Sequence, residues 1–230
     1  MTSRARSSQG PAVRTALRPA RPVSTRLPVA LALLLLAAGC SKDGAGSRAP
    51  EETELGWTAW EAGDYTTART HFLTAVSEDD GYADAHHGLG WAQAFLGSLP
   101  QAVTAFTNAK SEGLDTPDPD AGLAVVLRDL PDLDGAIASA LVALDASSAW
   151  SFSHRPSIDW HDLRLILAQC YFRKGPGTYD EAQAQVDILD PANGLDPASP
   201  PTWTVGAITY DTYAEALLMA IEALEAAIGG

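Results

Sequence analysis

Histidine and aspartate side chains gather in one short segment of this 230-residue chain. His154, Asp159, His161 and Asp162 flank Trp160, and imidazole nitrogens and carboxylates are ligands that zinc accepts in proteins. A metal-dependent reaction is therefore one hypothesis for this segment. The alternative, which we favour, is a solvated loop in which an aspartate caps the following helix. We accordingly expect no metal, no cofactor and no catalytic residue.

The other residues that carry reactive groups do not form a catalytic arrangement. His86 and His87 are adjacent, so on a helix their side chains point about 100° apart and cannot share a metal. Asp132 and Asp134 match part of a calcium loop, but leucines occupy its first and last ligand positions, where carboxylates are required. Glycine-rich phosphate loops and the common hydrolase motifs are absent from the sequence. We therefore predict that the protein is not an enzyme.

Cys40 follows a sequence that is typical of secretion. Six arginines and no acidic residue precede an apolar stretch from Leu27 to Ala38, which is too short to cross about 30 Å of hydrocarbon. The small residues Ala37, Ala38 and Gly39 stand immediately before the cysteine. This arrangement resembles the lipobox of bacterial lipoproteins, and the resemblance implies acyl chains on Cys40. The alternatives are an ordinary cleaved signal and a buried apolar strand.

The resemblance implies a signal peptide at residues 1–39, a flexible tether at residues 40–48, and anchoring through Cys40. We expect the protein at the cell membrane or outer membrane, on its periplasmic or extracellular side. The chain after Gly39 contains nine basic and 29 acidic residues, a net charge of −20. Such a surface repels nucleic acids and anionic lipid headgroups, so neither is an expected partner. Cys170 is left without a disulfide partner, and we predict a buried, apolar thiol.

The chain repeats itself at a spacing of 34 residues. When residues 49–82 are aligned with 83–116, eleven of the 34 positions carry identical residues. The identical pairs include Gly56/Gly90, Trp57/Trp91, Gly63/Gly97, Ala68/Ala102 and Phe72/Phe106. Small residues let two helices approach closely, and the phenylalanines fill the space between helices. The glycines at 63 and 97 suit the left-handed end of a helix. This period and pattern resemble the tetratricopeptide repeat (TPR).

Two further units continue the pattern. The third unit, at 117–150, predicts helices at 120–129 and 134–144. The fourth unit, at 161–190, predicts helices at 163–174 and 179–189, and its turn has two additional residues. Residues 191–203 are rich in proline and predict a loop, and residues 204–230 predict an amphipathic helix that closes the stack. The resemblance implies an all-α, right-handed solenoid of TPR helical hairpins with a C-terminal capping helix.

In TPR proteins the first helix of each repeat lines a concave face that binds partners. Carried over by position, the resemblance implies a groove formed by Trp57, Trp60, Glu61, His87, Trp91, Phe95, Val125, Arg128, Asp129, Gln169, Phe172 and Arg173. Packing between repeats is an equal alternative for Trp91 and Phe172. A short helix is not expected to bury both Trp57 and Trp60, so we predict that at least one is exposed or covered by a partner.

These observations favour a membrane-anchored scaffold for protein–protein interactions in the bacterial cell envelope. The groove would hold a peptide or helix of another envelope protein. One alternative is an envelope protein that binds glycans by stacking Trp57, Trp60 and Trp91 on sugar rings. A metal-dependent envelope enzyme that uses the histidine and aspartate cluster is the third hypothesis.

Overall fold

The computed structural model describes residues 47–228. Cys40, the predicted signal peptide at 1–39 and most of the predicted tether lie outside the described residues. Within the described range, no helix has both the length and the apolar character that crossing a membrane requires.

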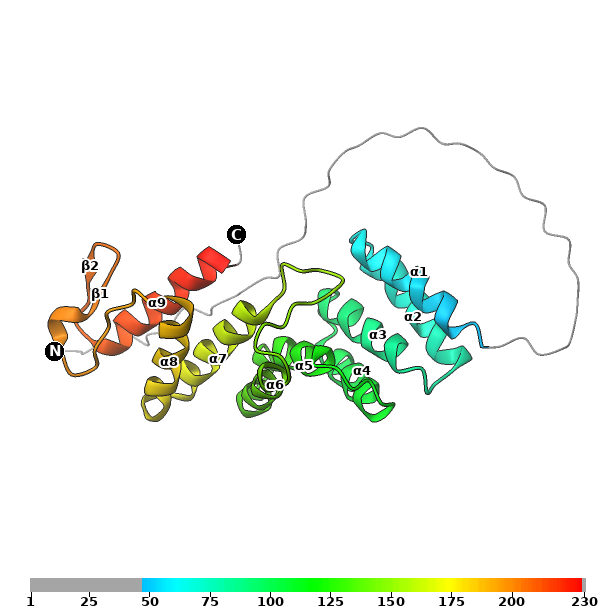
Figure 1. Cartoon of the computed structure of the whole chain (residues 1–230), viewed down its shortest axis with the longest axis horizontal. Helices are drawn as coiled ribbons and strands as arrows, with labels where there is room; N and C mark the ends of the chain where they lie inside the picture. The colour runs from blue at the N-terminus through cyan, green and yellow to red at the C-terminus, as the bar shows by residue number, and fades with distance from the viewer. Residues whose placement is uncertain (1–46, 229–230) are drawn as a thin grey trace, which may run out of the picture. The chain divides into compact units, whose positions relative to one another are not determined.

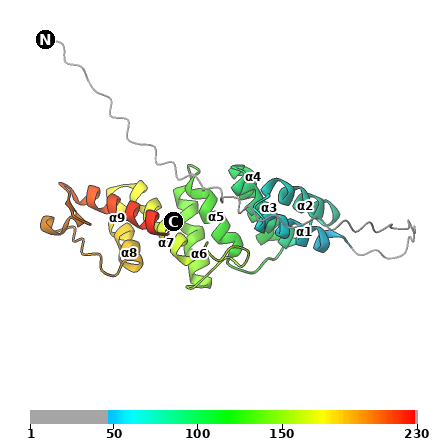
Figure 2. The same ribbon diagram turned by 90° about the horizontal axis from the view of Figure 1, so that it is seen from above.

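Helices that pack in consecutive pairs make up most of the described chain. They are α1 (Ala49–Glu61), α2 (Tyr65–Glu78), α3 (Ala83–Phe95), α4 (Leu99–Ser111), α5 (Asp118–Arg128), α6 (Leu133–Ala146), α7 (Trp160–Lys174), α8 (Tyr179–Leu189) and α9 (Tyr213–Ile228). The first eight form four hairpins, and each hairpin packs on the next. Figure 1 shows the hairpins in a row from α1 to α9, and Figure 2 shows the same row from above. The described residues therefore form an all-α solenoid.

A buried phenylalanine ring fixes how closely the first two hairpins approach. Phe72 of α2 has no exposed surface. A Cβ atom added to Gly56 of α1 would lie 2.6 Å from this ring, and one added to Gly88 of α3 would lie 2.2 Å from it. Real Cβ atoms do not approach so closely, so the ring needs a glycine on each side. The predicted role of Gly56 and Phe72 is confirmed, and Gly88 is a contact that the sequence comparison missed.

The same packing of a phenylalanine between two glycines recurs one repeat later, but the third hairpin lacks it. Phe106 of α4 lies between Gly90 and Gly122, where added Cβ atoms would come within 2.6 and 2.4 Å of its ring. In the third hairpin, Ala140 replaces the phenylalanine. Ala124 and Ala140 are both fully buried, so α5 and α6 pack together without an aromatic spacer.

Glycine and aspartate residues shape the turns within the hairpins. Gly63 and Gly97 follow the first helices with φ angles of 82° and 76°, which confirms their predicted left-handed conformation. The Asp64 carboxylate then accepts a hydrogen bond from the Thr67 backbone N–H at 3.0 Å and caps α2. In the fourth hairpin, the short 3₁₀ turn Pro176–Thr178 lies between α7 and α8.

The C-terminal helix is shorter than the sequence predicted. Its expected start at residue 204 is wrong, because α9 begins at Tyr213. Thr204–Val205 (β1) and Ile208–Thr209 (β2) form an antiparallel hairpin, with Gly206 at a φ of 61° in the turn. All four strand residues are β-branched, and this local preference for strands outweighs the helical pattern that follows. The helix α9 itself packs against α7 and α8.

The apolar core runs along the whole row of hairpins. One cluster of buried side chains extends from α1 to α7, and a second joins α7, α8 and α9. Cys170 lies in the first cluster with no exposed surface, and burial raises the pKa of its thiol to about 11. The thiol is therefore a buried apolar group, as predicted, and stays protonated at neutral pH.

Replacement of Gly88 by alanine is expected to destabilise the protein. Alanine gains about 1 kcal/mol over glycine inside a helix, but overpacking against a trapped ring costs about 1–3 kcal/mol. The Phe72 ring cannot retreat, because Gly56 lies against its other side. We expect a lower free energy of unfolding in urea for Gly88→Ala. The control is Gly177→Ala, because an added Cβ there meets nothing within 4 Å; equal effects of the two changes would contradict the packing described here.

Candidate functional site

A segment without a helix lies across the first helices of the repeats. Residues 147–159, which we call the insert, connect α6 to α7, and Figure 1 shows this segment reaching back toward α1 and α3. The helices α1, α3, α5 and α7 contact one another in sequence, and we call the surface they form the first-helix face. The insert closes on itself through hydrogen bonds from Phe152 N–H to the Ile158 carbonyl and from Trp160 N–H to the Trp150 carbonyl, at 2.9 and 2.8 Å.

Phe152 is the anchor of the insert. Its side chain is fully buried, and its ring stacks on Trp91 with the ring centroids 4.5 Å apart. The rings of Trp60 and Trp57 meet it edge-on at 5.3 and 6.0 Å. His87 lies 5.8 Å away. Tryptophan residues of two repeats therefore enclose one side chain of the insert.

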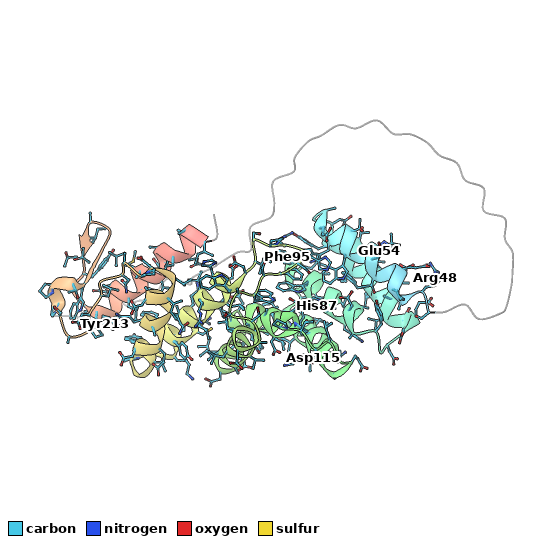
Figure 3. The ribbon with its side chains drawn as sticks, in the orientation of Figure 1. Arg48, Glu54, His87, Phe95, Asp115 and Tyr213 are labelled. Atoms are coloured by element: carbon cyan, nitrogen blue, oxygen red, sulfur yellow. The ribbon has the colours of Figure 1, made fainter. Side chains whose placement is uncertain are left out.

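Two basic side chains of the insert lie on the same aromatic surface. The His154 ring is stacked on Trp57 at 3.8 Å, and its Nδ1 atom lies 2.7 Å from a carboxylate oxygen of Glu61. The Arg155 guanidinium lies 4.5 Å from the Trp60 ring and 4.8 Å from the Phe95 ring. These distances permit cation–π attraction. Figure 3 shows Phe95 near the end of α3, beside the insert.

The prediction that Trp57 or Trp60 is exposed or covered by a partner is wrong, and Trp91 follows the alternative of packing between repeats. Trp57, Trp60 and Trp91 are 6%, 0% and 1% exposed, and His87 is also buried. Trp57 and Trp60 are both part of the core, because the insert covers the side of α1 that the repeat pattern leaves open. The cover that we expected from a partner comes from the chain itself. That these residues bind a partner stays a prediction.

The groove residues predicted on α5 and α7 lie in different surroundings. Val125 is half-buried against the core, and Asp129 pairs with Arg128 at 3.1 Å. Arg128 donates to the Gln169 side-chain oxygen at 3.4 Å, and Arg173 donates to the Arg128 carbonyl at 2.5 Å, so α5 and α7 bring these three together. Phe172 instead stacks on Tyr179 of α8, with the ring centroids 5.0 Å apart. This ring contact lies within the fourth hairpin and not between repeats.

A chain of hydrogen bonds links the buried tryptophans to an aspartate at the start of α3. Trp91 Nε1 donates to His87 Nε2 at 3.0 Å, which places the proton of a neutral His87 on Nδ1, 3.5 Å from Asp84. Trp57 Nε1 donates to the other Asp84 oxygen at 3.2 Å. Burial acts to raise the pKa of the Asp84 carboxyl, whereas hydrogen bonds from the His87 and Trp57 side chains act to lower it. The pKa lies below its ordinary value, so Asp84 is ionised at neutral pH.

A solvent-open hollow of about 540 Å³ lies beside the insert. We call it the acidic hollow, because carboxylates and aromatic edges dominate its lining. Its side chains include Thr53, Glu54, Trp57 and Glu61 from α1, Tyr82 and Asp84 from the start of α3, and His154 from the insert. Figure 3 shows Glu54 on α1. The acidic hollow thus lies on the first-helix face at α1 and the start of α3.

The histidine and aspartate cluster does not converge on one point. Asp159 and Asp162 form a reciprocal capping box at the start of α7. His161 Nδ1 lies 2.9 Å from Asp159, whereas His154 is directed to Trp57 and Glu61. Within residues 47–228, no three histidine, cysteine or acidic side chains are placed to hold a metal.

Sequence reasoning identified Trp57, Glu61 and Trp91 but missed the residues that cover or adjoin them. Phe152 and Arg155 belong to a segment that has no repeat pattern, so no periodic signal marked them. The aromatic residues Trp150 and Phe152, which stand between serines in the insert, were the available sign that this segment is partly buried.

Three solved structures are similar to this chain, and two of them are described as TPR proteins. YrrB, a TPR protein described as having an unusual peptide-binding site, has a TM-score of 0.55 and 17% identity, over 79% of this chain and 89% of its own. An O-GlcNAc transferase of Thermobaculum terrenum has a TM-score of 0.49 and 16% identity, over 66% of this chain and 28% of its own. The thermophilic TPR protein TTC0263 of Thermus thermophilus has a TM-score of 0.34 and 20% identity, over 74% of this chain and 99% of its own.

Neither a family model nor a curated protein sequence matches the chain. The likeness to YrrB, together with the four consecutive hairpins, shows that the described residues have a TPR-like fold.

Proposed function

We propose that this protein is a membrane-anchored scaffold of the bacterial cell envelope that binds a polypeptide segment of a partner protein. The observation that carries the proposal is the acidic hollow, which opens to solvent on the first-helix face of a TPR-like stack. Glu54 and Thr58 of α1 line it and are exposed, so a partner can reach them. The described peptide-binding site of YrrB agrees with this use of the fold.

The insert determines which part of the first-helix face is available. Truncation of a buried phenylalanine costs about 3–5 kcal/mol, and release of the insert would also expose the tryptophans that enclose Phe152. A partner peptide would have to offset this loss before it gained any contact. We therefore place the partner in the acidic hollow and on its rim, while the insert stays bound.

The proposal of a lipid anchor is based on the sequence that precedes the described residues. The arginines, the short apolar stretch and the small residues before Cys40 support cleavage and lipid attachment. Because the chain after Gly39 carries a net charge of −20, attraction to anionic lipid headgroups cannot hold it at the membrane. Two or more acyl chains would provide stable anchoring without such attraction.

The two alternative functions receive less support. Glycan binding by stacking needs accessible aromatic faces, but Trp57, Trp60 and Trp91 are buried beneath the insert. A metal-dependent enzyme needs converging ligands, whereas His154 and Asp159 take part in separate contacts. Binding of a polypeptide is therefore the function that the geometry supports best.

Photo-crosslinking in the native bacterium tests the partner. A photoreactive amino acid at position 58, in the acidic hollow, is expected to give a discrete adduct with one envelope protein, identified by mass spectrometry. The control is position 73 on α2, because Leu73 is 47% exposed and lies outside the hollow. An absence of adducts at position 58, or the same adducts at both positions, would contradict the proposed binding of an envelope partner.

Replacement of the lipobox cysteine tests the anchor. We expect Cys40→Ser to move the protein from the membrane fraction to the soluble fraction, because no acyl chain can then be attached. Cys170→Ser is the matched control, since Cys170 is a buried core thiol and its loss should leave the membrane fraction unchanged. Fractionation followed by immunoblotting measures both, and retention of Cys40→Ser in the membrane would refute lipid anchoring.

A further inference from the structure

Carboxylates from two helices face the acidic hollow. Glu54 and Glu61 are two turns apart on α1 and so lie on one side of that helix. Glu61 is paired with His154, and Asp84 of α3 accepts a hydrogen bond from Trp57. Glu54 differs from both, because within residues 47–228 its carboxylate forms no ion pair or hydrogen bond. Among the described residues, the hollow therefore contains one exposed carboxylate without a partner and two that already accept hydrogen bonds.

Thr53 gives an independent indication that the hollow receives a polar group. Its side chain lines the hollow, the residue is 2% exposed, and its hydroxyl makes no hydrogen bond in the described structure. Threonines on helices usually donate to the carbonyl four residues earlier, as Thr58 and Thr70 do here. An unpaired buried hydroxyl is destabilising, so a donor that reaches Thr53 from the hollow would satisfy its oxygen.

The charge of the lining determines which kind of group fits. Three carboxylates line the hollow, no lysine or arginine does, and His154 already contacts Glu61. An anion would be repelled by this lining. A cation on a flexible stem would meet Glu54 with its charged end, while its methylene groups pack on the aromatic edges of Trp57 and Tyr82. An ammonium or guanidinium group also supplies the N–H donor that the Thr53 oxygen lacks.

We propose that the acidic hollow binds a lysine or arginine side chain of a partner polypeptide, with Glu54 as the charge partner and Thr53 as a hydrogen-bond acceptor. This inference rests on the proposed function for the polypeptide nature of the ligand. A hollow of about 540 Å³ that is open to solvent admits a side chain together with its flanking backbone. The partner is thereby defined as a protein with a basic residue in an exposed segment.

Calorimetric titration of the full chain in detergent with two synthetic peptides tests the proposal. The first peptide has one central lysine between glycine and serine residues and blocked ends, and the second carries ε-acetyl-lysine at the same place. We expect the lysine peptide to bind about tenfold more tightly, as the loss of one charged hydrogen bond predicts. Equal affinity for the two peptides would overturn the proposal.

Three variants separate a specific site from general attraction to an acidic protein. Glu54→Gln is expected to weaken lysine-peptide binding about tenfold, whereas Glu78→Gln, an equal charge change at an exposed position on α2, leaves it unchanged. Thr53→Val is expected to weaken binding without lowering the thermal unfolding temperature, because it removes an unpaired hydroxyl. Equal effects of the two glutamate changes, or unaltered binding by Thr53→Val, would overturn the assigned roles.

The peptide titration tests the cation site, and the crosslinking experiment tests the proposed function. Either proposal can therefore be contradicted without the other. A crosslinked envelope partner whose capture is unaffected by Glu54→Gln overturns the cation site and leaves the proposed scaffold function. Lysine-dependent peptide binding without any crosslinked partner supports the site and contradicts the proposed function.

Discussion

The contact between Phe152 and the tryptophans of the first two repeats determines what this protein can present on its first-helix face. A stack of short helical hairpins leaves the first helices of its repeats open on one side. Here that side carries Trp57, Trp60 and Trp91, which would form a large exposed apolar surface. The insert covers the surface with Phe152, and the side chains of His154 and Arg155 lie over the outer rings.

This cover changes the character of the face from aromatic to acidic. Once the tryptophan rings are buried, the accessible part near α1 and α3 is lined by Glu54, Glu61 and Asp84. Asp84 belongs to both regions, because it accepts the Trp57 N–H of the core and also lines the hollow. The geometry of the acidic hollow thus depends on the aromatic packing beneath it, and His154 of the insert supplies one of its walls.

The fold could be predicted from the sequence because its determinants recur at a fixed spacing. Phe72 and Phe106 each need a glycine on the adjoining first helix, and this requirement is visible as matched residues 34 positions apart. The start of the C-terminal helix was predicted incorrectly because the β-branched residues before it form a strand hairpin. The burial of both Trp57 and Trp60 was missed for a different reason. Whether Trp57 is exposed depends on Phe152, which is far away in the sequence and lies in a segment without periodicity, so pattern analysis has no means to pair them. The unpaired hydroxyl of Thr53 likewise becomes visible only when its neighbours are known.

The most direct test of the covered aromatic face is the free energy of unfolding of Phe152→Ala, measured by urea titration of the full chain. If Phe152 fills the space between the tryptophans, the free energy of unfolding falls by about 3–5 kcal/mol. A change below about 0.5 kcal/mol, the range of substitutions at exposed positions, would show that the insert does not occupy the first-helix face.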